Sequence, residues 1–335
     1  MQKHIYVSSP KSNQIYVWGF VEKQELKLIQ VLDINLQAQP ITISNKNNLL
    51  YVGVKPKLGI NTYEIKPNGS LFLKDHINLD FSINYIFLNK EENLLFCSSF
   101  HGNCLCVVKI NEFGIPERIV NITKNIYGCH SAKINETNNK LYVTSLKEDQ
   151  TYVYDISFYE SSVYLKENYL LKTQNQYGPR HISFYKKGEF IYIINEFNGT
   201  IDVWRFDKNE KIHTYIQNIS LVKFNAIKNN IFTELWSSDI HIHPKKNFLY
   251  ACDRKLNSIT LFHINRQTGL LNFIKKYDTE QQPRSFCIDD KGKYLFVVGE
   301  KSNNITMYKI SKKNGKIKKI YSYFSGLGPL WVVIK

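Results

Sequence analysis

Cysteine is scarce in this chain and never occurs in a metal-binding spacing. Only 6 of the 335 residues are cysteine, and no two of them form a CxxC pair or match the spacing of a zinc finger. They lie mainly in apolar stretches, where a free cysteine behaves as a small hydrophobic residue. This pattern argues against a metal finger and favours a reducing compartment, so we expect a cytoplasmic protein.

Long apolar runs and a targeting segment are also missing. No apolar run reaches the roughly 18 residues that a membrane-spanning helix needs. The first ten residues, MQKHIYVSSP, contain no apolar core followed by a small-residue cleavage site. The sequence therefore predicts a soluble protein that has no membrane partner.

The short motifs of several large enzyme classes are absent as well. No GxSxG, HExxH, GxxxxGKS/T or GxGxxG occurs in its usual context. Ser131 and Ser285 lack the setting of a nucleophilic serine on a strand-to-helix turn. We therefore expect neither a covalent serine mechanism nor a cofactor.

One histidine-rich stretch, SSDIHIHP at 237–244, superficially suggests a metal site. Alternation along a strand would put Asp239, His241 and His243 on one face, so chelation is conceivable. No further cysteine or acidic residue has a matching position, and a closed metal site usually needs four ligands. The sequence therefore predicts no bound metal.

The charge is strongly positive, with a net value of +15 and an isoelectric point near 9.3. Such a balance can indicate nucleic acid, a membrane surface or an anionic small substrate. The lysines, however, are scattered through turns such as Lys186-Lys187, Lys245-Lys246 and Lys312-Lys313, and no continuous basic arm is present. We therefore expect no nucleic-acid partner, whereas a local site for an anion remains compatible with the charge.

What the chain does contain is a repeat, best seen in the stretch 178–204, which predicts three short strands joined by tight turns. An aromatic anchor in the middle strand recurs seven times at steps of 45 to 58 residues. The anchors are Tyr6, Tyr51, Phe96, Tyr142, Tyr192, Tyr250 and Phe296. Twelve residues after the anchors stand Trp18, Tyr63, Val108, Tyr154, Trp204, Phe262 and Tyr308, six of them aromatic. Two registers kept through seven copies indicate a genuine repeat.

A period of about 45 residues with four strands per unit is typical of a β-propeller. The expected fold is all-β: one seven-bladed propeller domain over residues 1–335, with four antiparallel strands per blade. The first unit, 3–37, has only three strands. The missing one is predicted at 328–334, where GPLWVVI repeats the form of GPRHI at 178–182. The C-terminal strand would thus close the first blade and leave no exposed edge.

The longest step, 58 residues between Tyr192 and Tyr250, places an insertion near 221–236. It could be a lid or rim loop beside the channel, or an insertion that the surface tolerates. The sequence leaves both interpretations open.

The register also predicts where functional side chains meet. The first strand of a blade lines the channel and the second runs antiparallel beside it, so the start of one and the end of the other share a rim. Twelve residues before the anchors stand Gln39, Asn84, His130, Arg180, Ser238 and Arg284. The positions four residues after the anchors are occupied by Pro10, Lys55, Phe100, Leu146, Glu196, Arg254 and Glu300.

One mouth should therefore receive several reactive side chains, with His181, Asp239 and Asp253 close to them. Arginines and a lysine around a carboxylate and an imidazole suit an anion site with a base. The alternative is that the charged pairs only hold neighbouring blades together. Placing six ionisable groups at a narrow channel, however, has a desolvation cost that holding the blades together does not require. The six groups are His130, Arg180, Arg284, Glu196, Arg254 and Glu300.

Ten motifs in order along the chain resemble those of the seven-bladed propeller lactonases, the cycloisomerase-2-like family that includes the bacterial 6-phosphogluconolactonases. They are YVSSPKSNQIYVW, LLYVGVKP, GCHSAKI, GPRHISF, NEFNGTIDVW, SDIHIHP, LYACDR, QPRSF, GEKSNNITMY and GPLWVV. The resemblance covers nearly the whole chain and implies hydrolysis of 6-phospho-D-glucono-1,5-lactone in the cytoplasm, within the oxidative pentose phosphate pathway.

The resemblance also implies a site made of a histidine, two arginines and a glutamate. The matching positions are His130 in GCHS, Arg180 in GPRH, Glu196 in NEFN and Arg254 in ACDR. We expect Glu196 or His130 to act as the base for water, and Arg180 or Arg254 to stabilise the oxyanion. Phosphate and substrate contacts are expected from a wider set, namely Arg284, Lys55, His181, Asp239 and Glu300.

Two other functions stay open from the sequence. The same propeller could be a lactonase or lactonising enzyme for a dicarboxylic lactone, because the arginines would be kept. It could also be a non-enzymatic propeller that binds protein partners at its rim. The oligomeric state is not predicted.

Overall fold

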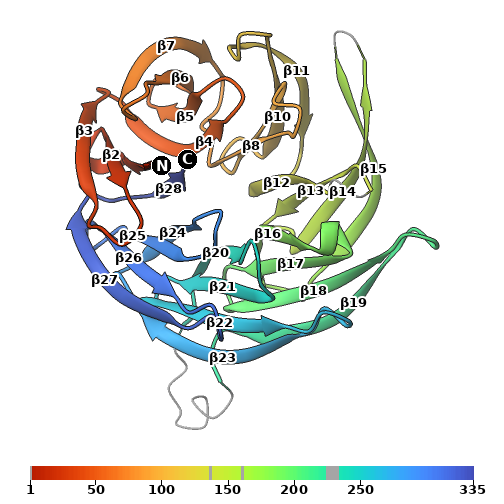
Figure 1. The fold of residues 1–335 in the computed structure, drawn as a ribbon. Coiled ribbons are helices and arrows are strands. Elements are labelled where there is room, and N and C mark those ends of the chain that lie inside the picture. Colours follow the sequence, from red (N-terminus) through yellow and green to blue (C-terminus); the bar gives the residue numbers. More distant parts are fainter. Residues whose placement is uncertain (1, 136–137, 160–161, 224–233) are drawn as a thin grey trace.

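Seven four-stranded antiparallel sheets form a ring around a central channel in the computed structural model, which describes residues 2–135, 138–159, 162–223 and 234–335 (Figure 1). The predicted seven-bladed propeller is confirmed. Numbering the blades along the chain and naming strands from the channel outward, blade 1 contains β28 (Trp331–Ile334), β1 (Lys3–Ser9), β2 (Gln14–Phe20) and β3 (Lys27–Asp33); blade 2 β4 (Gln37–Ser44), β5 (Leu49–Lys55), β6 (Gly59–Ile65) and β7 (Leu71–Asn78); blade 3 β8 (Tyr85–Leu88), β9 (Leu94–Ser99), β10 (Cys104–Ile110) and β11 (Pro116–Lys124).

The remaining blades follow the same order. Blade 4 contains β12 (Cys129–Asn135), β13 (Lys140–Ser145), β14 (Gln150–Phe158) and β15 (Val163–Lys172); blade 5 β16 (Pro179–Tyr185), β17 (Phe190–Asn195), β18 (Thr200–Asp207) and β19 (Ile212–Ser220); blade 6 β20 (Ser237–Ile242), β21 (Phe248–Asp253), β22 (Ser258–Ile264) and β23 (Leu271–Asp278); blade 7 β24 (Pro283–Ile288), β25 (Tyr294–Gly299), β26 (Asn304–Ile310) and β27 (Ile317–Phe324). Two short 3₁₀ turns, η1 (Pro10–Ser12) and η2 (Lys186–Gly188), interrupt the strands. Neither helical turn in the described ranges is long and apolar enough to span a bilayer.

Strand β28 closes the ring as predicted. It pairs antiparallel with β1, so that Tyr6 lies opposite Val333 and Ser8 opposite Trp331. Both chain ends therefore lie in the same blade (Figure 1). This pairing gives the first sheet its channel-lining strand. It also covers the edge of β1 that would otherwise be exposed.

The core lies between the blades rather than within them. Seven apolar clusters of described residues each combine side chains from two neighbouring sheets, for example Tyr192 and Ile194 of blade 5 with Leu249 and Phe262 of blade 6. All seven aromatic anchors are completely buried. The repeat is thus periodic because every blade must bury both faces against its neighbours.

The choice of tyrosine or phenylalanine at the anchor follows from the next blade. The hydroxyls of Tyr6, Tyr51, Tyr192 and Tyr250 donate to the carbonyls of Gly69, Gly114, Gly269 and Gly315 at 2.6–3.1 Å. These glycines occupy the turn between the third and fourth strands, at positive φ values that favour glycine. The corresponding turns of blades 1, 4 and 5 have no glycine, and the anchors facing them are Phe296, Phe96 and Tyr142, whose hydroxyl contacts His213 instead.

A β-bulge recurs at the start of the inner strands, at the position that the sequence register singled out. In β16 the pairing passes from Pro179 opposite Asn195 to His181 opposite Ile194, so Arg180 is an extra residue. Bulges occur at the same place in β4, β12, β20 and β24. A bulge breaks the strict alternation of faces, and this allows two successive side chains to turn toward one mouth.

Candidate active site

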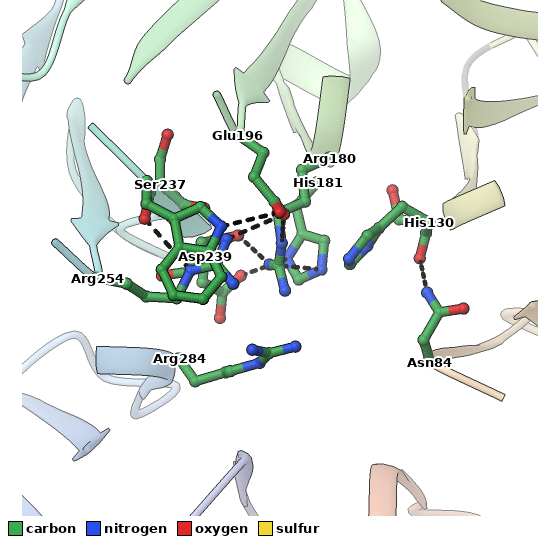
Figure 2. Close-up of polar contacts among 12 residues, drawn as sticks. Asn84, His130, Arg180, His181, Glu196, Ser237, Asp239, Arg254 and Arg284 are labelled. Carbon is green, nitrogen blue, oxygen red and sulfur yellow. Dashed lines mark hydrogen bonds and ion pairs between the residues drawn. The ribbon is translucent and has the colours of Figure 1, made fainter. Parts of the chain in front are cut away.

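Five of the predicted rim residues lie together at one mouth of the propeller, namely His130, Arg180, Glu196, Arg254 and Arg284. Figure 2 shows His130, Arg180, His181, Glu196, Asp239 and Arg254 gathered there, with Arg284 reaching toward them from blade 7. They come from the bulged starts of the inner strands and from the ends of the second strands in blades 4 to 7. Arg180, Glu196 and Arg254, which are far apart in the sequence, are in direct contact in the structure.

Glu196 is the centre of this cluster and forms two ion pairs. Its Oε2 accepts from Arg180 Nε at 2.7 Å and from Arg254 Nη2 at 3.0 Å, and its Oε1 accepts from Trp236 Nε1 at 3.0 Å. Burial alone would raise the pKa of the Glu196 carboxyl, but Arg180 and Arg254 outweigh burial and lower it. Glu196 is therefore ionised, and both of its carboxylate oxygens accept hydrogen bonds from the protein.

Arg254 is held from three directions and is only 3% exposed. Its Nη2 donates to Ser237 O at 2.7 Å and its Nε to Trp236 O at 3.3 Å. The guanidinium carbon lies 3.8 Å from the centre of the Trp236 ring, a stacking geometry that suits arginine. Burial, followed by the charge of Arg180, lowers the pKa of Arg254 to about 9, so the side chain still carries its charge at neutral pH.

Arg180 connects Glu196 to a second chain of polar contacts. Besides Glu196, it donates through Nη1 to Ser238 O and to His181 Nε2, the latter at 3.2 Å. Burial chiefly lowers the pKa of Arg180, to about 10, while Glu196 opposes this effect. Arg180 is thus a fixed, buried cation that links two inner strands.

His181 is neutral and in a defined tautomer. Its Nδ1 lies 2.8 Å from Asp239 Oδ1 and its Nε2 accepts from Arg180, so Nδ1 holds the proton. Burial and then Arg180 lower the pKa of His181 to about 3. For the Asp239 carboxyl, burial would raise the pKa, but His241 and the hydrogen bond from His181 hold it well below its usual range. Both nitrogens of the His181 ring therefore have partners within the protein.

The contacts continue from His181 through Asp239 to a cavity between the inner strands. Asp239 Oδ2 lies 3.1 Å from Nε2 of His241, whose side chain is 37% exposed. Asp239 and His241 both line a cavity of about 470 Å³ between the inner strands β4, β8, β12, β20, β24 and β28. Asp239 therefore belongs to the partition between this cavity and the mouth that contains Glu196.

His130 differs from His181 because the protein does not engage its ring. Within the described residues neither ring nitrogen has a hydrogen-bond partner, and Nδ1 is buried. The ring packs edge-on against His181 at 5.2 Å, and Asn84 fixes the backbone by donating to His130 O at 2.7 Å. Burial, reinforced by Arg180 and His181, lowers the pKa of His130 well below its ordinary value. His130 is thus a neutral imidazole with an uncommitted lone pair.

Arg284 is the most accessible arginine of the site, with a side chain that is 29% exposed. Its Nη1 lies 3.4 Å from Glu300 Oε2, and Glu300 Oε1 also pairs with Lys11 Nζ at 3.2 Å. Figure 2 shows that the guanidinium of Arg284 points toward the Arg180 and His181 side chains rather than away from the channel. Arg284, Glu300 and Lys11 form a second charged cluster, which we call the outer cluster.

Two other predicted residues, Lys55 and Asp253, lie outside these networks. Lys55 ends β5 on the same rim, but it makes no ion pair or hydrogen bond through its side chain with any described residue. Asp253 caps the turn after β21 by accepting from the backbone N–H groups of Trp236, Lys255 and Leu256. Its role is therefore structural. Lys55 stays a predicted phosphate ligand without structural support from its contacts.

The histidine-rich stretch does not assemble as a ligand set. His243 lies beyond β20, where its Nε2 contacts Gly292 O at 2.9 Å and its Nδ1 accepts from Lys245 N at 3.0 Å. His241 instead faces Asp239. Among the residues that the structure describes, no group of three histidine, cysteine, aspartate or glutamate side chains is close enough to hold a metal ion.

Sequence reasoning missed two residues of the site. Trp236 contacts Glu196 and Arg254, yet it comes from the predicted insertion at 221–236 and has no counterpart in the other blades. Residues 224–233 of this insertion lie outside the described part of the chain, so its proposed lid role stays a hypothesis. Lys11 follows Pro10, which is in the rim register, by one residue, and a wider window around each rim position would have found it.

The neutral, buried state of His181 makes stability depend on pH. Because the pKa is about 3 in the folded protein and near 6.5 in the unfolded chain, the unfolded state binds the extra proton at mild acid. The stabilising contribution is complete above pH 6.5 and is lost as the pH falls toward 3. Between pH 7 and pH 5 it should amount to about 2 kcal/mol. Urea unfolding of the parent and of His181→Asn at both pH values measures it, and an equal pH dependence in the two proteins would contradict the assignment.

Comparison with known proteins identifies a family and several relatives of this chain. A family model described as "Lactonase, 7-bladed beta-propeller" matches residues 4–334. A protein named 6-phosphogluconolactonase from Buchnera aphidicola (subsp. Acyrthosiphon pisum, strain Tuc7) is 43% identical over 334 residues, which cover 100% of this chain and 99% of that protein. One of the same name from Erwinia tasmaniensis is 34% identical, with 100% and 99% covered.

Solved structures share the fold at much lower identity. The periplasmic gluconolactonase PpgL of Pseudomonas aeruginosa superposes with a TM-score of 0.88 at 18% identity, covering 100% of this chain and 99% of that one. A Lactobacillus plantarum protein gives the same TM-score at 19% identity, with 100% of both chains covered. At this identity the superpositions establish the fold alone.

Proposed function

Because this chain belongs to the family of seven-bladed β-propeller lactonases, we propose that it hydrolyses 6-phospho-D-glucono-1,5-lactone to 6-phosphogluconate at the mouth that contains Glu196. The observation that best supports this site is the pairing of a neutral, unengaged imidazole on His130 with two buried guanidinium groups. A base next to fixed positive charge is what attack of water on an ester carbonyl requires. Relatives named 6-phosphogluconolactonase match this chain over its full length.

His130 is the proposed base. It is neutral at physiological pH, and no described residue competes for its ring nitrogens. It would accept a proton from water while the water oxygen adds to the lactone carbonyl. When the tetrahedral intermediate collapses, the bond to the ring oxygen breaks and the imidazolium returns its proton to that oxygen. Acid and hydroxyl are then both present on the opened chain, and the histidine is regenerated.

The two buried arginines are proposed to stabilise the oxyanion. Arg180 Nη2 and Arg254 Nη1 have no acceptor among the described residues, whereas their other nitrogens are engaged. Preorganised charge of this kind needs no reorganisation when negative charge develops, which makes it effective in a water-poor site. Glu196 would not touch the reacting atoms. It is a positioning residue that keeps both guanidinium groups together.

The phosphate is proposed to bind on the blade 7 side, at Arg284. This arginine is more exposed than Arg180 and Arg254, and its only ion pair in the described chain is the long contact with Glu300. A planar guanidinium can form two parallel hydrogen bonds to a phosphate. Lys55, on the same rim, is the remaining predicted ligand. The six free thiols agree with a reducing compartment, so we place the reaction in the cytoplasm.

Purified protein should accelerate the opening of 6-phosphogluconolactone well above the spontaneous rate. The assay generates the lactone with glucose-6-phosphate dehydrogenase and follows 6-phosphogluconate with its dehydrogenase. A dicarboxylic lactone is tested in parallel, because it would use the same arginines. Activity on that lactone alone would replace the proposed substrate, and background rates with both would support a rim that binds protein partners instead.

A further inference from the structure

The outer cluster contains a lysine, Lys11, that is neither in the rim register nor among the site residues implied by the family resemblance. Lys11 and Arg284 share the single carboxylate of Glu300, at 3.2 and 3.4 Å. Gln282 Nε2 also donates to that carboxylate at 3.2 Å. Two cations and one anion leave the outer cluster with one uncompensated positive charge.

Lys11 belongs to a turn that is fixed in place. It lies in η1, between β1 and β2 of blade 1, and its N–H donates to Leu327 O at 3.2 Å. Leu327 N–H in turn donates to Ser12 Oγ at 3.1 Å. The side chain runs over Gly328, where a Cβ atom would lie only 2.6 Å from Lys11 Cδ. The close approach of Gly328 and the backbone bonds together direct the lysine toward Glu300 and blade 7.

The ammonium group itself remains accessible. The Lys11 side chain is 58% exposed, compared with 29% for Arg284 and 1–2% for Arg180 and Arg254. Of the cations in the outer cluster and in the cluster around Glu196, Lys11 and Arg284 are the most exposed. Both can therefore bind an incoming anion without withdrawing a counter-charge from a buried carboxylate. Their exposed N–H donors also suit an oxyanion that remains partly hydrated.

We propose that Lys11 and Arg284 together form the subsite for the phosphate dianion of the substrate, with Glu300 as the internal anion that holds them in place. This inference rests on the proposed function and adds the residue that selects a phosphorylated lactone over an unphosphorylated one. A phosphate group carries nearly two negative charges and three acceptor oxygens, which match one guanidinium and one ammonium better than a single cation. The reacting carbonyl, in contrast, would face the inner cluster, by which we mean His130, Arg180, Glu196 and Arg254.

Replacing Lys11 by methionine tests the subsite, because the apolar stem is kept and only the charge is lost. We expect the ratio of kcat/KM for 6-phosphogluconolactone to kcat/KM for glucono-1,5-lactone to fall about tenfold, mainly through KM. The Kd of 6-phosphogluconate, measured by calorimetry, should rise by a similar factor, and added salt should narrow the difference from the parent. Lys11→Arg should retain most of the discrimination.

Lys147→Met is the matched control. Lys147 is an exposed lysine on the same rim whose ammonium group lies 5.0 Å from the centre of the Phe100 ring, and it is not part of the outer cluster. Its loss removes the same charge and should leave the discrimination ratio unchanged. If the parent hydrolyses the phosphorylated lactone and Lys11→Met keeps the parental ratio and Kd, the subsite is wrong while the function stands. If the parent opens neither lactone, the function fails, and the subsite with it.

Discussion

Replacing His130 by glutamine is expected to lower kcat for 6-phosphogluconolactone by roughly 10²–10⁴-fold, the range that a positioned general base contributes. Glutamine occupies similar space but cannot accept a proton at neutral pH. The reason for the large effect is that no other described imidazole of the site is available, because His181 is bound on both sides by Asp239 and Arg180. Initial rates of the coupled assay, corrected for spontaneous opening, measure the loss.

The neutral state of His130 adds a pH signature to this variant. Since burial and the neighbouring arginines lower the pKa of His130 well below 6.5, kcat/KM of the parent for glucono-1,5-lactone, which has no phosphate that would titrate near pH 6, should stay constant as the pH falls through 6.5 and should decline only in more acidic solution. His130→Gln should lack this acidic decline. His101→Gln serves as the control, because His101 is an exposed histidine that packs against Phe100 on the same rim. A parental decline centred at the ordinary histidine pKa would contradict the assignment.

Replacing Glu196 by glutamine is expected to destabilise the protein by about 3 kcal/mol as well as to reduce activity. The change leaves Arg180 and Arg254 buried beside each other without a counter-charge, and both guanidinium groups are almost completely inaccessible. From the sequence Glu196 was an equal candidate for the base. Its two ion pairs and lowered pKa indicate instead that stability and activity should fall together.

Urea unfolding and steady-state kinetics on Glu196→Gln separate these roles. Glu300→Gln is the matched control for stability alone, since it removes the same charge from a carboxylate whose partners Lys11 and Arg284 are more exposed, and it should cost less than about 1 kcal/mol. If Glu196→Gln kept the parental stability but lost kcat together with the acidic decline, Glu196 would be the base and His130 would not.

The sequence was sufficient to predict the fold because propeller packing is periodic. Each anchor must be buried between two sheets, so an aromatic residue recurs where Tyr192 stands, and tyrosine persists where the next blade offers a glycine carbonyl, as at Gly269. The closing strand β28 was predictable for the same reason. The stretch GPLWVVI at 328–334 repeats the form of GPRHI at 178–182, and an unpaired β1 would leave an exposed edge.

The composition of the mouth was predictable, but the roles within it were not. Counting from the anchors located Arg180, Glu196 and Arg254, although the bulge that lets both Arg180 and His181 face the mouth has no clear sequence signal. The protonation state of Glu196 depends on how many cations surround its carboxylate. The spacing of rim positions along the sequence does not give that number. Trp236 was missed because it comes from a unique insertion, and Lys11 because a 3₁₀ turn extends the rim by one residue.

A structure of the protein with 6-phosphogluconate bound tests the central claim most directly. We predict that the product occupies the mouth, with its carboxylate within hydrogen-bond distance of His130 and an arginine of the inner cluster, and with its phosphate at Arg284. Product bound instead in the cavity that His241 and Lys133 line, with the mouth around Glu196 left unchanged, would contradict it.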